Sequence, residues 1–500
     1  MSKRYNVLMI LTDQQNIGTI GTYGAKVCRT PNLDSLADEG VKFTNAFTLT
    51  SICSPARASL LTGVYPYKHG VLVNDGVLNR DGFILGTRRD LGLDPGPFIL
   101  NRYLAEAGYQ CGYVGKWHID RYRKPTDMGF KGKDFLGYAH PGSDVWEGFR
   151  WKAAPFNKPN YYELYLKERG LKTPRITNAL YSGNPDFQKQ ELCALLDAPE
   201  EASIPYFVAE ETISLIREFS KSDRPFFIWA NFWGPHSPCI VPEPYYSMYE
   251  PDSVEPPKSY LEEKFTRKPE AHKLYEKRWS LSVDGWERWQ QIIARYWGYC
   301  TQIDAMVGRM IEELRGLGLL EDTIIIFTAD HGDMLGAHRL IDKGSFMYDE
   351  TYRIPMIISH PDGVKGVVCD DLVQLHDLTP TLCDIATSQV PDLLDGQSLL
   401  PVLKGEEARN KRDAIYCTME GLTMIFSQRM VRTRDYKFVF NASSIGELYD
   451  LRNDPHELNN LFGQPEVACV QQELAGLMGK FMDQLGDPLA PWFHEIIGTY

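Results

Sequence analysis

The sequence predicts an α/β protein in which helices sandwich a large, mostly parallel sheet, followed by a smaller C-terminal unit. Two kinds of segment support this prediction. Continuous apolar runs, such as 5–12 and 323–329, are typical of strands that are buried on both faces of a sheet. Other segments, such as 302–314, repeat apolar residues every three or four positions, as amphipathic helices do.

The predicted strands and helices alternate along most of the chain. Strands are expected at 5–12, 41–47, 110–114, 225–232, 323–329 and 353–359. Helices are expected at 31–40, 101–108, 210–219 and 302–314.

The remaining segments have a different character. Residues 120–205 and about 241–290 are polar and aromatic with little periodicity, so we expect them to form surface excursions over the site. After about residue 405 the strands become shorter, and a closing helix is expected at roughly 465–485. We therefore expect a large α/β domain at 1–405 and a small subdomain at 406–500.

Charge and cysteine usage limit the function classes. The formal net charge of −13 argues against nonspecific binding to nucleic acid or to an anionic membrane. No apolar run approaches the roughly 18 residues of a membrane span, and the apolar stretch before Asp13 is too short for a signal peptide. The ten cysteines are scattered without a Cys-x-x-Cys pair, which favours reduced thiols in a cytoplasmic protein.

Residues 51–63, with the sequence SICSPARASLLTG, form the most distinctive segment. Ser54 is a suitable N-cap, Pro55 suits the first helical position, and Gly63 can end a short helix. Cys53 should then precede a helix N-terminus, where free N–H groups favour negative charge, and Arg57 can lie on the same face. From spacing alone, a reactive cysteine and an ordinary buried thiol are about equally favoured.

Polar residues follow four of the apolar strands. They are Asp13 and Gln14, Lys116 and His118, His236, and Asp330 and His331. Ligands of an open parallel sheet bind beyond the carboxyl ends of its strands, so one shared site is the economical interpretation.

The same residues suggest a metal ion. Asp13, Gln14 and Asp330 offer oxygen ligands, which favour a hard divalent ion such as Ca²⁺ or Mg²⁺. His331 would add an imidazole ligand, so Mn²⁺ is also a candidate for the bound ion. In the alternative interpretation, Asp13 and Asp330 only cap loops.

The motif Cys53-x-Pro55-x-Arg57, followed by Leu-Leu-Thr-Gly, resembles the signature of type I sulfatases in the alkaline-phosphatase-like superfamily. Other matching segments follow in order across nearly the whole chain. The resemblance implies that superfamily's fold, with a small C-terminal subdomain built on an antiparallel sheet and a helix. It also implies that a formylglycine-generating enzyme oxidises Cys53 to formylglycine, whose hydrate is the nucleophile.

The resemblance further implies a bound divalent ion that contacts residue 53. Sulfatases of this type usually hold Ca²⁺, whereas related phosphonate and phosphodiester hydrolases use Mn²⁺. Gln14 departs from the commoner Asp-Asp pair, which leaves the identity of the ion open.

Roles for the other residues also follow from the resemblance. Arg57 is expected to hold the hydrate, and Lys116 matches the sulfate-binding lysine. His118 matches the histidine paired with the hydrate and is the candidate base. His236 and Lys343 match residues that touch the sulfate and the leaving oxygen, with His236 preferred as the acid.

Further residues have weaker signals in the sequence. Asn74 is a candidate substrate ligand, because it follows the Cys53 helix. The histidines His69, His338 and His376 are expected to be structural or exposed. Loop packing, rather than a sugar platform, is expected for aromatic residues at 146, 149, 151, 161 and 162.

The expected function is hydrolysis of a small sulfate monoester, either an aryl sulfate or a sulfated sugar. The alternative is a phosphonate monoester or phosphodiester hydrolase, but such enzymes tend to place neutral hydroxyl residues where Lys116 and His118 stand. A third interpretation, a non-catalytic anion-binding protein, requires an unmodified Cys53. The sequence does not identify the alcohol part of the substrate, and a homo-oligomer is left open.

Overall fold

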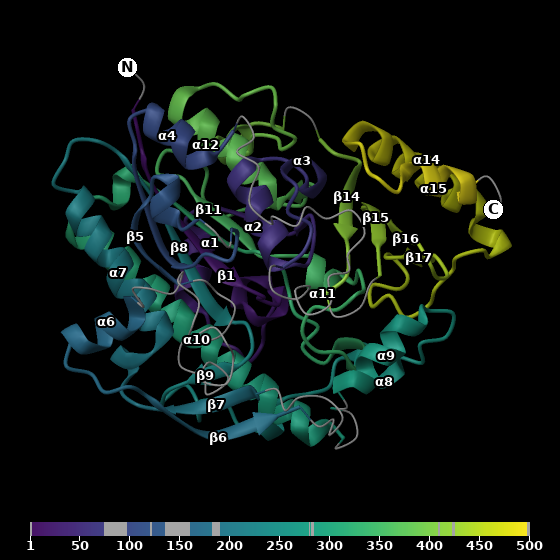
Figure 1. Cartoon of the computed structure of the whole chain (residues 1–500), viewed down its shortest axis with the longest axis horizontal. Helices are drawn as coiled ribbons and strands as arrows, with labels where there is room; N and C mark the ends of the chain where they lie inside the picture. Colours follow the sequence, from purple (N-terminus) through teal and green to yellow (C-terminus); the bar gives the residue numbers. More distant parts are fainter. Residues whose placement is uncertain are drawn as a thin grey trace.

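The computed structural model describes residues 3–74, 98–120, 123–135, 161–182, 191–279, 281, 285–408, 411–422 and 426–497. Its centre is an eight-stranded sheet with the strand order β12-β2-β11-β10-β1-β8-β4-β5 (Figure 1). In that order the strands are Val367–Cys369, Val41–Phe43, Met356–Ser359, Thr323–Ala329, Asn6–Asp13, Phe226–Pro235, Gln110–Lys116 and Lys131–Phe135. Strand β11 pairs antiparallel with both neighbours, and the other pairs are parallel. The predicted mostly parallel sheet is therefore confirmed.

The central strand β1 is buried on both faces, as its continuous apolar sequence predicts. Leu8 and Ile10 belong to the hydrophobic core on one face of the sheet, and Met9 and Leu11 belong to the core on the other face. Successive side chains of a strand point to opposite faces, so a strand between two helical layers needs apolar residues at nearly every position.

Helices cover both faces of this sheet (Figure 1). One core contains residues of α1 (Pro31–Asp38), α6 (Tyr161–Glu168), α7 (Ile204–Phe219) and α10 (Trp286–Gly316). The other core contains residues of α2 (Cys53–Thr62), α4 (Leu100–Glu106), α12 (Leu378–Thr387) and α13 (Leu400–Leu403). The apolar stripe that predicted a helix at 302–314 lies within α10, whose first turns belong to the segment expected to be irregular.

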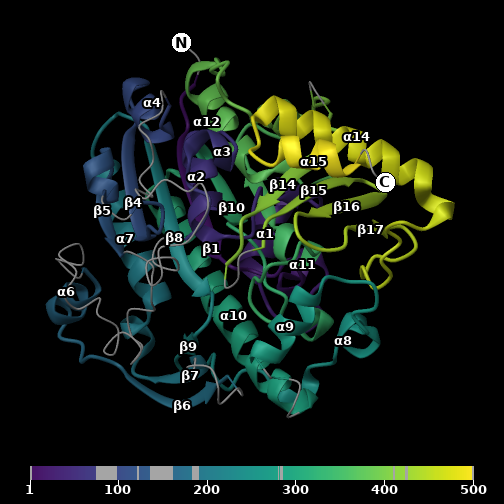
Figure 2. The same cartoon turned by 45° about the vertical axis from the view of Figure 1, so that its right-hand side comes forward.

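The C-terminal part forms a second sheet of four strands, beside the large one (Figure 2). Its strands pair antiparallel in chain order: β14 (Ala414–Met419), β15 (Gln428–Thr433), β16 (Tyr436–Asn441) and β17 (Glu447–Asp450). The helices α14 (Ala468–Leu485) and α15 (Ala490–Ile497) pack together, and α14 contacts this sheet. The predicted antiparallel subdomain and its closing helix are confirmed, and we propose its boundary near residue 405.

The two segments expected to be irregular excursions contain more regular structure than the sequence predicts. Strand β5 extends the large sheet, and β6 (Arg175–Tyr181), β7 (Glu191–Asp197) and β9 (Cys239–Val241) form a separate three-stranded sheet. The edge strand β6 is mostly exposed, so it lacks the apolar pattern by which strands are found. The remaining strands and α-helices of the described residues are β3 (Ala46–Phe47), β13 (Val373–Gln374), α3 (Pro66–His69), α8 (Lys258–Glu262), α9 (Glu270–Trp279) and α11 (Asp349–Tyr352).

Of the aromatic residues in these segments, Tyr162 is buried and its hydroxyl donates to the Ala202 carbonyl at 2.5 Å, so it serves packing as expected. Trp146, Phe149 and Trp151 lie outside the described residues. Among the helices of the described ranges, none is both long and apolar enough to cross a bilayer.

Candidate active site

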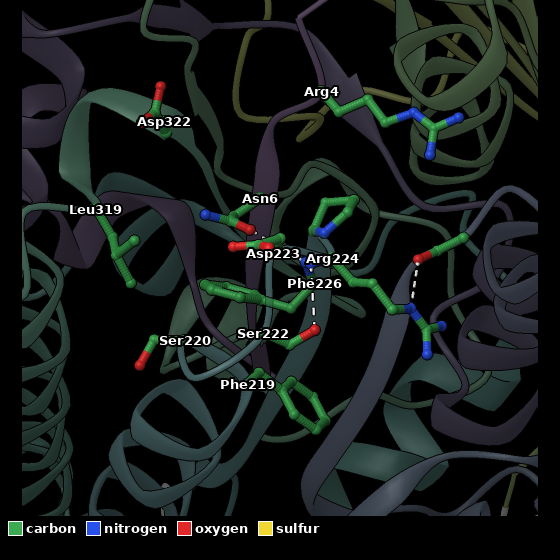
Figure 3. A pocket seen from close by; sticks show the side chains of 12 residues that line it. Arg4, Asn6, Phe219, Ser220, Ser222, Asp223, Arg224, Phe226, Leu319 and Asp322 are labelled. Atoms are coloured by element: carbon green, nitrogen blue, oxygen red, sulfur yellow. Dashed lines mark hydrogen bonds between the residues drawn. The ribbon is translucent and has the colours of Figure 1, made fainter.

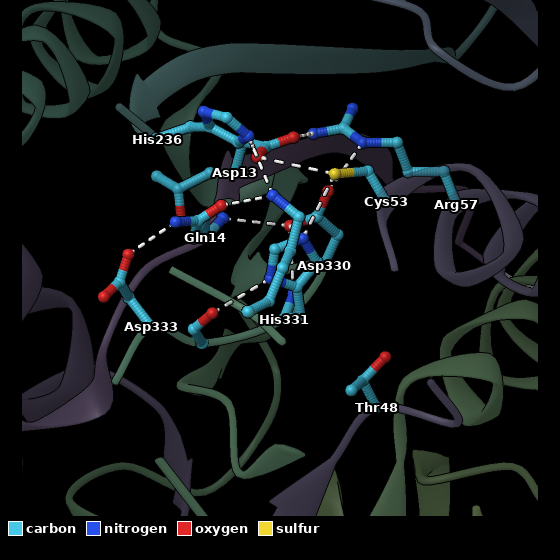
Figure 4. A network of polar contacts seen from close by, with 12 residues as sticks. Asp13, Gln14, Thr48, Cys53, Arg57, His236, Asp330, His331 and Asp333 are labelled. Atoms are coloured by element: carbon cyan, nitrogen blue, oxygen red, sulfur yellow. Dashed lines mark hydrogen bonds and ion pairs between the residues drawn. The ribbon is translucent and has the colours of Figure 1, made fainter. Parts of the chain in front are cut away.

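The predicted convergence of strand ends is confirmed. Strand β1 lies between β10 and β8, and β8 lies next to β4, with all four strands running in the same direction. Their carboxyl ends carry Asp13, Asp330 and His236, which meet above one edge of the sheet (Figure 4). Lys116, at the end of β4, joins them, with its Nζ 2.6 Å from Asp13 Oδ2. Gln14 turns away from β1 with a φ of 60°, a left-handed conformation that is uncommon outside glycine.

Helix α2 carries Cys53 into this cluster. The helix begins at Cys53, and Gly63 ends it with a φ of 71°, as predicted. The expected N-cap at Ser54 is wrong, because Ser54 lies inside the first turn. Its backbone N–H donates instead to Asn74 Oδ1 at 2.9 Å. Asn74 therefore satisfies a helix N–H next to Cys53, and its Nδ2 lies 3.9 Å from the thiol sulfur.

Arg57 holds the two carboxylates of the cluster. Its Nη2 donates to Asp13 Oδ2 at 2.9 Å and its Nε donates to Asp330 Oδ2 at 2.8 Å, with all three side chains fully buried. Lys116 Nζ also lies 2.6 Å from Asp13 Oδ2. Burial would raise the pKa of Asp13, but Lys116, His236 and Arg57 outweigh it and hold the pKa well below its usual value. Asp13 is therefore ionised.

Four side chains are grouped closely enough to hold a metal ion. One donor atom from each of Asp13, Cys53, Asp330 and His331 lies within 4.8 Å of the others, and all four residues are buried. His331 Nδ1 lies 2.9 Å from the Gly332 carbonyl, which can only accept, so the ring proton is on Nδ1. The other ring nitrogen, Nε2, faces Cys53 Sγ at 3.2 Å. These residues fit a divalent cation, because both carboxylates are held by cations and the imidazole is oriented.

The Cys53 thiol lies in a field of opposing charges. Burial and the nearby Asp13 raise its pKa, whereas Lys343, Lys116 and His331 lower it. The three positive charges outweigh burial and Asp13, so the pKa of Cys53 lies below its ordinary value. The same positive charges would attract an anionic group brought next to residue 53.

Lys343 reaches the cluster from the loop after β10. Its Nζ lies 2.8 Å from His236 Nε2 and donates to Gln14 Oε1. His236 Nδ1 lies 2.5 Å from the Ser237 carbonyl, so it carries the ring proton and Nε2 accepts from Lys343. Burial, followed by Lys343 and Lys116, lowers the pKa of His236 well below its usual value.

His118 lies beside the cluster, in a left-handed backbone conformation with a φ of 46°. Burial is the main cause that lowers its pKa, and the charges of Lys116, Asp13 and Arg57 also act on it. The imidazole is therefore neutral at physiological pH.

Three residues that contact the predicted site residues were not themselves predicted from the sequence. Trp233 lies under Lys116, with Nζ 4.5 Å from its ring centroid, and its ring centroid is 5.1 Å from that of His236. Asn231 Oδ1 accepts from Arg57 Nη1 at 3.2 Å. Asp333 Oδ2 accepts from Gln14 Nε2 at 2.5 Å. Trp233 and Asn231 lie within the hydrophobic strand β8, whose sequence pattern does not indicate a site residue. Asp333 follows the Asp330-His331 pair without a motif of its own.

The histidines that had no expected partner are structural, as predicted. His69 Nε2 lies 2.9 Å from Ser59 Oγ on the buried side of α2, and burial lowers its pKa to about 3. His338 contacts Glu263, and His376 is buried beside Tyr65.

A separate open pocket of about 600 Å³ lies at the opposite edge of the sheet (Figure 3). Asn6 and Phe226, at the beginnings of β1 and β8, line it together with Arg4 and Arg224. It contains none of the residues that the sequence predicts for the active site.

Comparisons with known proteins agree with this fold and site. The family model described as Sulfatase matches residues 5–388, and a model described as N-sulphoglucosamine sulphohydrolase, C-terminal, matches residues 336–484. An uncharacterized sulfatase, YidJ, of Escherichia coli strain K12 is 30% identical over 98% of this chain and 91% of its own length.

Two further similarities are informative. An N-acetylglucosamine-6-O-sulfatase of Bacteroides thetaiotaomicron is 26% identical over 97% of this chain and 88% of its own. The solved phosphonate monoester hydrolase of Agrobacterium radiobacter superposes with a TM-score of 0.73 at 27% identity, covering 96% of each chain.

The fold and the matches to sulfatase family models and relatives together define this protein as a hydrolase of the alkaline-phosphatase-like superfamily. The Sulfatase model spans more than half of the chain, so the chain belongs to the sulfatase family and is a sulfuric ester hydrolase.

Proposed function

We propose that this protein hydrolyses the sulfate monoester of a sulfated sugar or an aryl sulfate, with formylglycine formed from Cys53 as the nucleophilic residue. The observation that supports the proposal best is the position of Cys53. It is fully buried at the first turn of α2, 3.2 Å from the oriented His331 imidazole and within the group of potential metal ligands. An ordinary core thiol has no need of the Asp13 and Asp330 carboxylates, or of the charges of Lys116, Lys343 and His331, around it.

Asp13, Gln14, Asp330, His331 and residue 53 would hold one divalent cation. When bound, such a cation lowers the pKa of a coordinated hydroxyl and neutralises charge on the sulfate. We favour Ca²⁺, because three of the side chains offer oxygen, with Mn²⁺ as the alternative that the imidazole permits.

Lys116 and Lys343 would supply the positive charge for the sulfate oxygens. Both ammonium groups are buried, and both act on the charge state of Cys53. A buried cation acts strongly on a nearby anion, because little water screens it. Arg57 would play a different part, since its guanidinium is already engaged by Asp13 and Asp330 and keeps the carboxylates in place.

The contact between Lys343 and His236 suggests which group assists the leaving oxygen. His236 was the preferred acid from the sequence, but its Nε2 accepts from Lys343 in this arrangement and holds no proton to give. We propose that the Lys343 ammonium group donates a hydrogen bond to the leaving oxygen and stabilises its negative charge, and that His236 orients the ammonium group. His118, a buried neutral imidazole, is proposed as the base that regenerates the aldehyde.

The sugar part of the proposal is supported by the similarity to one relative, the N-acetylglucosamine-6-O-sulfatase of Bacteroides thetaiotaomicron. A second candidate activity, hydrolysis of phosphonate monoesters, is favoured by the likeness to the Agrobacterium enzyme. The two candidates are separated by comparing kcat/KM for an aryl sulfate and a matched phosphonate monoester. A large preference for the phosphonate would contradict the proposal.

The modification of Cys53 is tested by intact-protein mass spectrometry. Conversion of the thiol to the aldehyde lowers the mass by about 18 Da, and protein produced together with a formylglycine-generating enzyme should show this loss. The Cys53→Ala variant should show neither the loss nor turnover. Fully active protein with an unmodified thiol would overturn the proposal. The maturation enzyme, the cytoplasmic location and any homo-oligomer stay predictions.

A further inference from the structure

The side chain of Gln14 is held at both ends of its amide group. Nε2 donates to Asp333 Oδ2 at 2.5 Å, and Oε1 accepts from Lys343 Nζ (Figure 4). The backbone of Gln14 is held as well, because its N–H donates to Asp330 Oδ1 at 3.0 Å and its carbonyl accepts from the Tyr296 hydroxyl at 2.6 Å. Gln14 is fully buried, so solvent water does not replace these partners.

The chemistry of the two amide ends matters for a cation. A carboxamide has an oxygen and a nitrogen of nearly equal size, and a rotation of 180° about the last side-chain bond exchanges them. A hard cation binds the oxygen and is repelled by the NH₂ group. For Gln14 to contribute to a metal site, something must therefore prevent the exchanged orientation.

Asp333 has the properties required for this. An ionised carboxylate can only accept, so it can bind the nitrogen end of the Gln14 amide and not the oxygen end. Its own position is fixed by three contacts or constraints: Oδ1 accepts from the Leu335 N–H at 2.7 Å, its carbonyl accepts from Asn16 Nδ2 at 2.7 Å, and only 3% of the residue is exposed.

Lys343 also favours the observed orientation, but it touches the atom that a cation would need. A cation bound to Gln14 Oε1 competes with the Lys343 ammonium group for that oxygen. Asp333 binds the opposite end of the amide and remains in place when the oxygen is taken. The carboxylate of Asp333 then holds the nitrogen end of the Gln14 amide.

We propose that Asp333 is a positioning residue that orients the Gln14 amide, so that its oxygen faces the divalent cation and its nitrogen faces away. This inference rests on the proposed function, since it requires a cation held by Asp13, Gln14, Asp330 and His331. It assigns to Asp333 a part in metal affinity without direct contact with the cation.

The substitution Asp333→Asn tests the orientation directly. The Asn oxygen is drawn to the Leu335 N–H, which leaves its NH₂ group facing Gln14. Two donors then face each other, and the Gln14 amide turns to present its oxygen to Asn and its nitrogen to the cation. Loss of a group that orients a ligand typically weakens metal binding by about 10-fold to 100-fold, and we expect Asp333→Asn to do so for Ca²⁺ and Mn²⁺ in isothermal titration calorimetry.

Two variants complete the experiment. Asp342→Asn removes an equal charge near Lys343 without a contact to the Gln14 amide, and it should weaken binding by less than about threefold. Gln14→Glu combined with Asp333→Asn offers an oxygen at both ends of residue 14 and should bind at least as tightly as the wild type. This rescue also shows that a protein with Asn at position 333 folds.

The outcomes distinguish the inference from the proposed function. If wild-type protein binds Ca²⁺ or Mn²⁺ and Asp13→Ala does not, the metal site exists; equal affinity in wild type and Asp333→Asn then refutes the role of Asp333 alone. An equal loss in Asp342→Asn and Asp333→Asn would also refute it, because charge rather than orientation would be responsible. If the wild type binds neither cation, both the proposed function and this inference fail.

Discussion

Arg57 lies between two carboxylates and contacts Asp13 at 2.9 Å, with neither side chain exposed to solvent. The same guanidinium contacts Asp330 at 2.8 Å. The stability of the strand ends and the geometry of the proposed metal site therefore depend on one buried cation.

Replacement of Arg57 should reveal this dependence. We expect Arg57→Leu to lower the free energy of unfolding by about 3–5 kcal/mol, because it leaves buried carboxylates without their partner. Arg57→Lys keeps the charge but cannot contact both carboxylates, so a smaller loss is expected. Urea denaturation in the presence of EDTA measures both effects. A loss below about 1 kcal/mol for Arg57→Leu would contradict the structural role.

Lys116 should matter for turnover. We expect Lys116→Ala to lower kcat/KM for an aryl sulfate by roughly 100-fold or more, the scale of one group that stabilises developing negative charge. Lys131→Ala, at an exposed position on β5, is the matched control and should leave kcat/KM unchanged. An effect below twofold for Lys116→Ala would remove Lys116 from the active site.

Trp233 should act through its contacts with Lys116 and His236. A desolvated cation–π contact is worth about 2 kcal/mol, so Trp233→Leu should reduce kcat/KM by about 30-fold. Trp233→Phe keeps an aromatic face and loses the Nε1–H donated to the His236 carbonyl at 3.1 Å, so it should fall between wild type and Trp233→Leu. Steady-state kinetics of the three proteins would show this order; equal activity in all three would exclude a role for the ring.

Removal of metal should affect both activity and stability. We expect EDTA to abolish turnover and to lower Tm, and Ca²⁺ or Mn²⁺ to restore both. A ligand at 100 times its Kd stabilises the native state by about 2.7 kcal/mol. Differential scanning fluorimetry across a titration of each cation tests this, with Asp13→Ala as the variant whose Tm should not respond. Full activity after exhaustive chelation would contradict the proposed metal.

A pH-dependent contribution to stability is expected from Glu263. Burial raises the pKa of this carboxyl, but His338 and Lys268 outweigh it and lower the pKa to about 2. The stabilisation is therefore present above pH 4.5 and is lost as the pH falls toward 2. It is on the order of 3 kcal/mol, since one pKa unit corresponds to about 1.4 kcal/mol.

The variant Glu263→Gln provides the comparison. It should be less stable than wild type at pH 7, and the difference should shrink as urea denaturation is repeated toward pH 3. Burial lowers the pKa of His338 to about 3, so protonation of this residue at low pH destabilises both wild type and Glu263→Gln. The quantity to follow is therefore the difference between the two curves, and a constant difference would count against the ion pair.

Much of the fold could be predicted because buried strands carry their signal in consecutive residues. The predicted strand at 323–329 coincides with β10, and the glycine at 63 ends α2 as expected. Strand β6 could not be found in this way, because an exposed edge strand needs no apolar alternation.

The residues of the candidate site likewise fall into those that the sequence predicts and those that it does not. Asp13 and Asp330 could be predicted because each directly follows an apolar strand. The capping of α2 by Asn74 and the contact of Asp333 with Gln14 could not, because the first depends on the path of the loop after α2 and the second joins residues more than 300 positions apart. The preference for His236 as acid illustrates a further limit, since its Nε2 accepts from Lys343, more than 100 residues away.

The hydrogen-bonded pairing of β1 with β10 has a consequence for ion selectivity. The Asp330 N–H donates to the Thr12 carbonyl at 3.2 Å, and Thr12 pairs with Ala329, so Asp13 and Asp330 follow paired residues at corresponding positions on neighbouring strands. Neighbouring strands are about 4.8 Å apart in every sheet. The backbone pairing therefore fixes the distance between these two positions. A change of the preferred ion, in evolution or by engineering, must come from substitution of side chains such as Gln14.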